Sequence, residues 1–352
     1  MTRSTGGLPD FAIRIDGAAL PVPAQSDVRS VTLEESVGSP SWFGIELSNW
    51  DEEKLQVAWS DGSLFAVGGT VEISLGYVDA LTKVMVAEIT SLEPVFAADS
   101  PPTLLVGGYS HAHRLARSRR TRSFLKMKDS AIAAQVAREA GLRAEVTDTK
   151  VALPYVVQAN QTDWAFLRER AARIGHEVFV RDKVLHFRPP QTAGTATQTL
   201  QLGDEITEFR PRLSTVGQVG EVTVRGWDVK AKKVVVGKAA TGQERSAMGA
   251  GSTGPRTAAK AFGKAATVQV DLAPGSKAEA DQIALGDFDA TALGFVRATV
   301  ECTGQPGLRA GIVVRIEGAG TRFSGPYYVT TVTHVLDSSG YRTTLTAERS
   351  GA

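Results

Sequence analysis

Cysteine, aromatic residues and net charge are all scarce in this sequence. Cys302 is the single cysteine, so no intrachain disulfide can form, as is typical of proteins that fold in a reducing compartment. The 39 Lys and Arg residues nearly balance the 38 Asp and Glu residues and leave a net charge of +1. Nucleic-acid-binding domains usually carry a basic surplus, so this balance argues against nucleic acid as a partner.

Long apolar runs are absent as well. No stretch approaches the ~18 consecutive apolar residues of a transmembrane helix. The first residues, "MTRSTGGLPDFAIRIDG", lack the apolar core of a signal peptide. We therefore expect a protein that is assembled in the cytoplasm and does not itself insert into a membrane.

Alternation of apolar and polar residues is the pattern that the sequence does contain, near both ends of the chain. "FAIRIDG" and "GTVEISLGY" lie in the first part, and "GIVVRIEGAG" and "PYYVTTVTHVLD" lie in the last. A period of two is typical of a half-buried strand. Together with the 35 glycines, these segments predict an antiparallel sheet or barrel in each part.

The two strand-rich parts also resemble each other. Val71 falls on Val314 and Thr90 on Thr333, at one constant offset (314 − 71 = 333 − 90 = 243). The pairs at the same offset between them are Ile73 with Ile316, Val86 with Val329, and Ile89 with Val332. Chance agreement between Val-rich strands and duplication of one unit both explain this match. Duplication predicts two copies of one β-barrel, one at each end of the chain.

The middle of the chain reads as a small α+β domain. "MKDSAIAAQVAREAGL" predicts a helix that Asp129 or Ser130 caps and that ends at Gly141. "YVVQANQTDWAFLRERAARIGHEVFV" predicts a strand, a second helix and a further strand, with Thr162 as the N-cap. The apolar stripe of this second helix and the glycine that ends it are Trp164, Leu167, Ala171, Ile174 and Gly175.

We interpret this second helix as a structural joint. Its apolar stripe is expected to pack on the sheet of the small domain. Its arginines, Arg168, Arg170 and Arg173, are expected on the outer side, facing solvent or a neighbouring subunit.

Residues 239–276 are mostly Gly, Ala, Ser and Thr and predict a flexible excursion, followed by a helix that Ser276 caps and Gly286 weakens. The predicted fold is therefore a β-rich α+β protein: two similar antiparallel β-barrels, with an α+β domain between them and a small helical insertion. Its predicted parts are a first barrel (8–110), the α+β domain (111–190), a second barrel (191–238 with 295–349) and the inserted loop and helix (239–294).

Patterns that suggest catalysis are weak. Residues 249–254 match GxGxxG, but the buried strand that this motif needs is missing before them. His111 and His113 could offer two metal ligands, yet no Cys, Asp or Glu follows closely. Cys302 alternates with apolar residues and reads as a small strand residue. We therefore expect no enzyme, no cofactor and no metal site.

A run of basic residues follows His113, including Arg114, Arg117, Arg119, Arg120 and Arg122. Clustered arginines can neutralise phosphates, which is the nucleic-acid interpretation. Only Phe124 interrupts the run as a base-stacking aromatic, so the alternative is a solvated, intersubunit or lumen-facing polar surface.

Three stretches carry a family resemblance. In chain order they are "HRLARSRRTRSFLKMKDSAIAAQVAREAGLRAEV", "YVVQANQTDWAFLRERAARIGHEVFVRDKVLHFRPP" and "LRAGIVVRIEGAGTRFSGPYYVTTVTHVLDSSGYRTTLTAER". They resemble the phage late control gene D family, the baseplate hub proteins of contractile phage tails and contractile injection systems. The chain is also similar to the hub part of the VgrG spike proteins of type VI secretion.

The resemblance implies a homotrimeric structural hub. Its three subunits would bring two barrels each, so that the trimer meets a hexameric inner tube on one side and a trimeric spike on the other. The sequence ends at Ala352 without a spike region, so the spike is expected to be a separate protein. Other baseplate proteins are expected partners, in a particle assembled in the bacterial cytoplasm. A tail-associated cell-wall hydrolase and a nucleic-acid-binding adaptor are the alternative functions.

Overall fold

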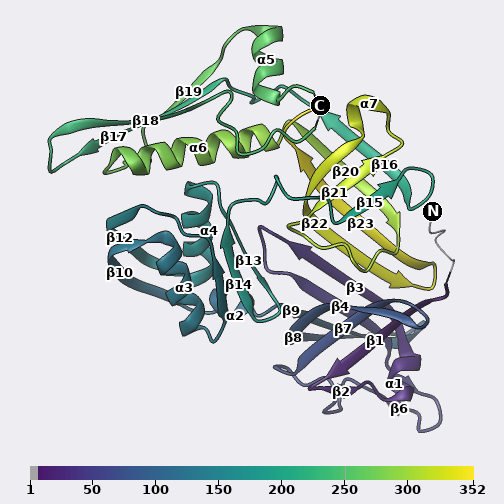
Figure 1. Cartoon of the computed structure of the whole chain (residues 1–352). Coiled ribbons are helices and arrows are strands. Elements are labelled where there is room, and N and C mark those ends of the chain that lie inside the picture. Colours follow the sequence, from purple (N-terminus) through teal and green to yellow (C-terminus); the bar gives the residue numbers. More distant parts are fainter. Residues whose placement is uncertain (1–6, 250) are drawn as a thin grey trace.

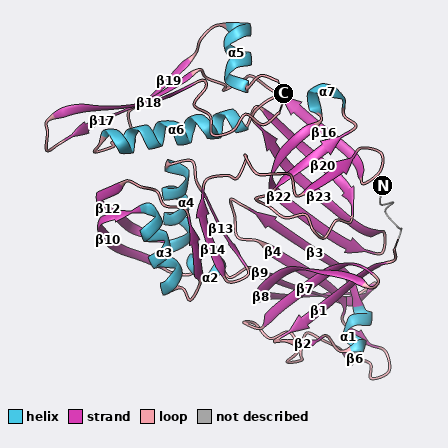
Figure 2. Cartoon of the chain, in the orientation of Figure 1, coloured by secondary structure: helices cyan, strands magenta, loops and turns pink. Residues whose placement is uncertain are grey.

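The computed structural model describes residues 7–249 and 251–352 of the chain. Figure 1 shows three parts: a large twisted sheet, a small domain of helices and short sheets beside it, and a long hairpin that lies over helix α6. Strands dominate, as Figure 2 shows. The β-rich α+β class predicted from the sequence is therefore confirmed.

Residues 9–109 form the first half of the large sheet. Its strands are β1 (Pro9–Ile15), β2 (Ala18–Ala19), β3 (Val28–Ser36), β4 (Trp42–Ser48), β7 (Thr70–Tyr77), β8 (Ala80–Ala97) and β9 (Ser100–Tyr109). Helix α1 (Val22–Asp27) and the small hairpin of β5 (Trp50–Asp51) and β6 (Gln56–Val57) lie in its loops. The alternation in the sequence places every second side chain in one apolar core, as in the fully buried Val71, Ile73 and Leu75 of β7.

Residues 198–213 and 296–349, on either side of the inserted segment, form the second half of the large sheet. Its strands are β15 (Gln198–Gln201), β16 (Ile206–Leu213), β20 (Val296–Thr303), β21 (Val313–Glu317), β22 (Gly325–Asp337) and β23 (Gly340–Arg349). The short helix α7 (Gly320–Phe323) precedes β22. Val314, Ile316, Val329 and Val332, which the repeat aligned with first-half residues, are fully buried in a separate core.

The two halves pair their strands in the same order. The first half runs β1-β7-β8-β9-β4-β3, and the second runs β15-β21-β22-β23-β20-β16. One difference is that β1 lies antiparallel to β7, whereas β15 lies parallel to β21. Strand β22 also pairs with β3 and so joins the halves into one 13-stranded sheet. Within the described residues, strand pairing does not close either half into a barrel. The predicted arrangement of two separate closed barrels is therefore not confirmed.

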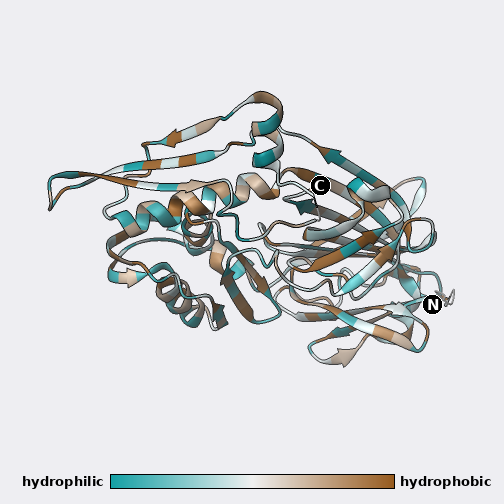
Figure 3. Ribbon diagram, turned by 45° about the horizontal axis from the view of Figure 1, so that its top comes forward, coloured by the Kyte–Doolittle hydropathy of each residue, from teal (hydrophilic) through white to brown (hydrophobic). Residues whose placement is uncertain are grey.

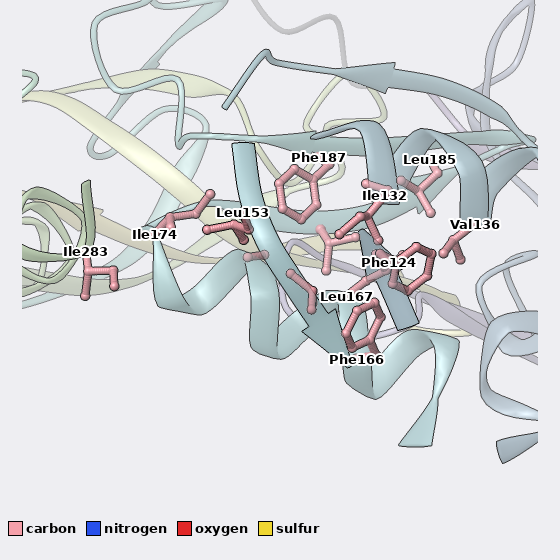
Figure 4. Packing of buried hydrophobic residues seen from close by; sticks show 14 of the residues in the cluster. Phe124, Ile132, Val136, Leu153, Phe166, Leu167, Ile174, Leu185, Phe187 and Ile283 are labelled. Atoms are coloured by element: carbon pink, nitrogen blue, oxygen red, sulfur yellow. The ribbon is translucent and has the colours of Figure 1, made fainter. Parts of the chain in front are cut away.

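The α+β domain follows the first half. Its elements are α2 (His113–Ala116), β10 (Arg119–Lys128), α3 (Asp129–Glu139), β11 (Arg143–Val146), β12 (Ala152–Thr162), α4 (Asp163–Arg173), β13 (Glu177–Arg181) and β14 (Val184–Arg188). Strands β10 and β12 form one antiparallel pair, and β11, β14 and β13 form a second sheet. Figure 4 shows Ile132 of α3, Phe166 of α4 and Phe187 of β14 in the core that these elements share.

The inserted segment begins earlier than predicted, at β17, and contains more helix and strand than predicted. It contains β17 (Glu221–Asp228), β18 (Lys233–Ala240), α5 (Gly254–Phe262), β19 (Ala266–Gln269) and α6 (Lys277–Leu293). Strands β18, β17 and β19 form a sheet of their own, so residues 221–238 do not belong to the second half as predicted. The prediction of a flexible loop is also wrong for α5 and β19, because α5 packs on α6 and β19 pairs with β17.

Helix α6 lies between this small sheet and the α+β domain (Figure 1). Its predicted cap is confirmed, since the Ser276 side chain accepts a hydrogen bond from the backbone N–H of Glu279 at 3.2 Å. A side chain on Gly286 would overlap the backbone of Ile174 and Gly175 at the end of α4. Gly286 therefore permits two helices to approach closely, which explains a residue that weakens an isolated helix. Gly237 of β18 gives α6 the same close approach on its other side.

Candidate assembly surfaces

Helix α4 begins and packs as its sequence pattern indicates. The Thr162 side chain accepts a hydrogen bond from the backbone N–H of Ala165 at 3.1 Å, which satisfies one of the free donors of the first turn. Gly175, with φ near +61°, follows the helix end. The four residues of the apolar stripe are all 5% exposed or less: Trp164, Leu167, Ala171 and Ile174.

Two arginines of α4 bind inside the chain, whereas we expected them to face solvent or another subunit. Arg170 donates from Nε to Oδ1 of Asp129, at the start of α3, over 2.7 Å. Arg173 donates to Oε1 of Glu279 in α6 over 2.9 Å and to the Leu272 carbonyl over 2.6 Å. The polar side of α4 thus ties it to both neighbouring helices.

The arginine run on β10 is largely paired within the chain as well. Arg122 donates to Glu139 over 2.5 Å and to Asp163 over 2.8 Å. Arg120 reaches the same two carboxylates over 3.1 and 3.5 Å. Because Glu139 ends α3 and Asp163 begins α4, these pairs fasten the strand to both helices.

Arg119 and Arg117 of the same run have other surroundings. Arg119 donates to the Asn160 carbonyl of the neighbouring strand over 2.8 Å. Arg117 is exposed and lines an open hollow of about 770 Å3 between the first half and the α+β domain. Since internal carboxylates take up much of the charge, the run presents less basic surface than its sequence suggests.

The carboxylate of Glu88 in β8 lies close to both His111 and His113. This carboxylate accepts from Arg114 and lies 2.7 Å from Nε2 of His113 and 3.9 Å from Nε2 of His111. Burial alone would raise the pKa of Glu88, but the hydrogen bonds from Arg114 and His113 outweigh burial and lower the pKa to about 2. These residues attach the first half to α2.

A buried carboxylate holds three parts of the molecule together. Glu35 of β3 accepts a hydrogen bond of 2.8 Å from the Nε of Arg309, which belongs to the second half. The same carboxylate lies 3.7 Å from the guanidinium group of Arg181 in β13. Burial opposes its charge, yet Arg309 and Arg181 keep the pKa of Glu35 below its ordinary value. His334 is fully buried nearby, and desolvation lowers its pKa to about 4, so the ring is neutral at pH 7.

A second buried carboxylate joins the α+β domain to the second half. Tyr328 of β22 donates from its hydroxyl to Glu177 over 2.5 Å, and Arg188 donates from Nε to Glu177 over 2.9 Å. Arg188 also donates to the Gly311 carbonyl over 3.0 Å. Desolvation dominates here and raises the pKa of Glu177.

These two carboxylates were not among the residues that we singled out in the sequence. A signal for Glu35 does exist, because it continues the apolar phase of Val31 and Leu33 at two-residue spacing. A charged residue at an inward position requires a partner. Local patterns do not reveal which partner, since Arg309 lies 274 positions away.

The remaining sequence candidates for chemistry have structural places. Cys302 is buried in β20, and burial raises the pKa of its thiol to about 12. Ala250 of the GxGxxG stretch lies outside the described residues, while Gly254 begins α5. In the described part of the chain, no three or more His, Cys, Asp and Glu residues gather as a metal site would require. No described helix is long and apolar enough to cross a membrane.

The family follows from a sequence model that matches residues 5–338. The chain belongs to the Alg8 N-terminal domain family. No curated protein matches it.

Solved structures show which fold this member of the family has. A 43 kDa tail protein of prophage MuSo2 from Shewanella oneidensis shares 12% identity at a TM-score of 0.71, over 97% of this chain and 98% of its own. A tail protein from Neisseria meningitidis MC58 shares 14% identity at a TM-score of 0.69, over 97% of this chain and 96% of its own. An E. coli component of the type VI secretion system shares 15% identity at a TM-score of 0.63, over 96% of this chain and 76% of its own. The chain therefore has the fold of phage tail proteins.

Proposed function

We propose that this chain is the central baseplate hub of a contractile phage tail or contractile injection system. It would act as a homotrimer that joins a hexameric inner tube to a trimeric spike. The likeness in fold to tail proteins and to a type VI secretion component supports a structural role of this kind. The resemblance of three sequence stretches to the late control gene D family supports the more specific role of hub.

The observation that carries the proposal is the repeated strand order in the large sheet. Each chain contains two halves with the same pairing sequence. A trimer of such chains offers six similar units, which is what a threefold assembly needs in order to meet a sixfold tube. The identical order of six strands in each half supports the duplication that the 243-residue offset suggested.

The proposed role is mechanical and not catalytic. The hub would keep tube and spike coaxial while contraction drives them through an envelope. The buried contacts of Glu35 and Glu177 support this role, because they connect the two halves and the α+β domain through charge-assisted hydrogen bonds.

The test is the oligomeric mass of the purified chain, with negative-stain views along the particle axis. We expect a trimer with a six-lobed ring that binds both an inner tube protein and a spike protein. A chain that stays monomeric in the presence of both proteins would contradict the proposal. A peptidoglycan zymogram is expected to show no clearing, and clearing would favour a cell-wall hydrolase instead.

A further inference from the structure

The outward face of the first half carries a groove where two glycines meet. Strands β4 and β9 place Gly44 directly opposite Gly107. Trp42 and Tyr109 form the next outward pair at one end, and Leu105 bounds the other end. The hollow measures about 420 Å3. The Ser91 hydroxyl lies over Gly107 and a Leu105 methyl lies over Gly44, so these side chains line the bottom of the hollow. A protruding group from another surface can enter the space that remains above them.

The groove is also acidic. Glu46 of β4 and Glu93 of β8 lie opposite Leu105, one on each side of it. No lysine or arginine lines the hollow. Glu46 accepts a weak hydrogen bond of 3.4 Å from Ser30. An occupant that combines apolar and cationic groups therefore suits this site.

A surface with that chemistry lies at the far end of the inserted segment. Trp227 of β17 and Val234 of β18 form a cross-strand pair that is 52% and 59% exposed. The turn beyond them adds Val229, 79% exposed, and the basic residues Lys230, Lys232 and Lys233. Asp228 accepts from the backbone N–H groups of Lys230 and Ala231 and so shapes the turn.

The position of this hairpin makes it available to another molecule. Gly237 shows which face of β18 meets α6, since a side chain there would overlap the backbone of Ala280. Val234 lies at an odd spacing from Gly237 and therefore faces away from the helix, together with Trp227. Figure 1 shows the turn between β17 and β18 projecting past α6, away from the large sheet, and Figure 3 shows it in a second view.

We propose that the β17–β18 turn of one chain seats in the Gly44–Gly107 groove of a second copy of this chain. The lysines would face Glu46 and Glu93, and the apolar residues would lie against Trp42, Tyr109 and Leu105. Each chain contributes one groove and one turn, so the contact is head-to-tail and can close into a ring. This inference rests on the proposed function and assigns the surfaces that would hold its trimer together.

Charge reversal with rescue tests the pairing. One variant carries Glu46→Lys with Glu93→Lys, a second carries Lys232→Glu with Lys233→Glu, and a third combines all four changes. Dissociation constants come from sedimentation equilibrium of the full chain. Each reversal alone is expected to weaken association at least about tenfold, and the combination is expected to return it to within about threefold of wild type.

Two controls carry single charge reversals of the same kinds elsewhere. Glu52→Lys changes an exposed loop residue of the first half, and Lys264→Glu changes an exposed residue between α5 and β19. Both are expected to associate as wild type does. Thermal unfolding checks each variant. If a reversal fails to fold, Glu46→Gln with Glu93→Gln and Trp227→Ser replace it, with weakened association expected.

The outcomes separate this contact from the trimer itself. Wild-type association that none of the reversals weakens would overturn the contact and leave the trimer standing. Weakening by either reversal without rescue in the combined variant would overturn the pairing of these two surfaces and indicate that each one contacts another surface of the chain. A wild-type chain that is monomeric at every concentration would overturn the trimer and this contact together.

Discussion

The two halves of the large sheet bury similar side chains but present different outward faces. In β4 and β9 of the first half, Trp42 lies opposite Tyr109 and Gly44 opposite Gly107. Strands β20 and β23 hold the equivalent places in the second half. There, Thr299 lies opposite Thr346, and Arg297 pairs with Glu348 over 3.0 Å.

The inward faces of the same four strands show no such divergence. Most inward residues of β4 and β9 and of β20 and β23 are almost fully buried aliphatic side chains. They include Ile45, Leu47, Leu104 and Val106 in the first half, and Ala298, Val300, Leu345 and Ala347 in the second. Core positions are constrained by burial, whereas outward positions are free to specialise. The difference therefore points to distinct neighbours for the two faces.

The largest effect is expected where the two halves meet. Glu35→Ala removes the carboxylate that pairs with Arg309 and Arg181 and leaves two half-buried guanidinium groups without their counter-charge. We expect the free energy of unfolding to fall by about 3–5 kcal/mol. Urea denaturation measures this loss. The control is the adjacent Glu34→Ala, which removes a more exposed carboxylate, and a loss equal to that of the control would contradict the role of Glu35.

A core substitution and an outward substitution test the contrast between faces directly. Leu345→Ala removes a fully buried side chain from the second half and is expected to cost about 3 kcal/mol. Leu105→Ala acts on a side chain that is 38% exposed and is expected to cost less than about 1 kcal/mol. Chemical denaturation of both variants provides the measurement. Equal losses would remove the distinction between core and outward positions.

Acid is expected to lower the stability of the first half through Glu88. The second half has no carboxylate at the matching position, because Thr331 stands there at the same offset (331 − 88 = 243). A carboxyl with its pKa lowered from 4.5 to about 2 stabilises the fold above pH 4.5, and this contribution is lost as the pH falls toward 2. Between pH 6 and pH 3 the wild type should lose about 2 kcal/mol that Glu88→Gln does not lose. Unfolding curves across this range would show the same slope for both proteins if Glu88 had no such role.

A small effect on stability is expected when the first face is made like the second. Trp42→Thr with Tyr109→Thr imitates the Thr299–Thr346 pair on an outward surface. The free energy of unfolding should change by about 1 kcal/mol or less per site, while self-association weakens. Thermal unfolding and sedimentation on the same samples check both results. Unchanged association would show that the aromatic pair is not part of a contact.

Local patterns were reliable for helix α4 but not for the start of α3. The prediction that Asp129 or Ser130 caps α3 is wrong, because the N-cap position is Lys128 and its side chain makes no capping hydrogen bond. The cap at Thr162 and the buried stripe of Trp164 to Ile174 follow from side chains within one helix, so spacing alone reveals them. The partners of Arg170 and Arg173 could not be predicted in this way, because they depend on how α3 and α6 pack against α4. The inserted segment was misjudged for a related reason. Its Gly- and Ala-rich composition resembles a loop, yet small residues such as Gly237 and Gly286 are needed where backbones approach closely.

The sequence by itself determined the strand-rich ends, the helices of the middle domain, the cap at Thr162 and the internal offset of 243 residues. These features depend on short-range spacing, which burial of one face imposes on each element separately. Only the tertiary structure decided that β22 joins the halves into one sheet, that Glu35 meets Arg309 and Arg181, and that Gly44 and Gly107 lie in a groove on the first half. These features depend on contacts between residues far apart in the chain, and no local pattern specifies such contacts.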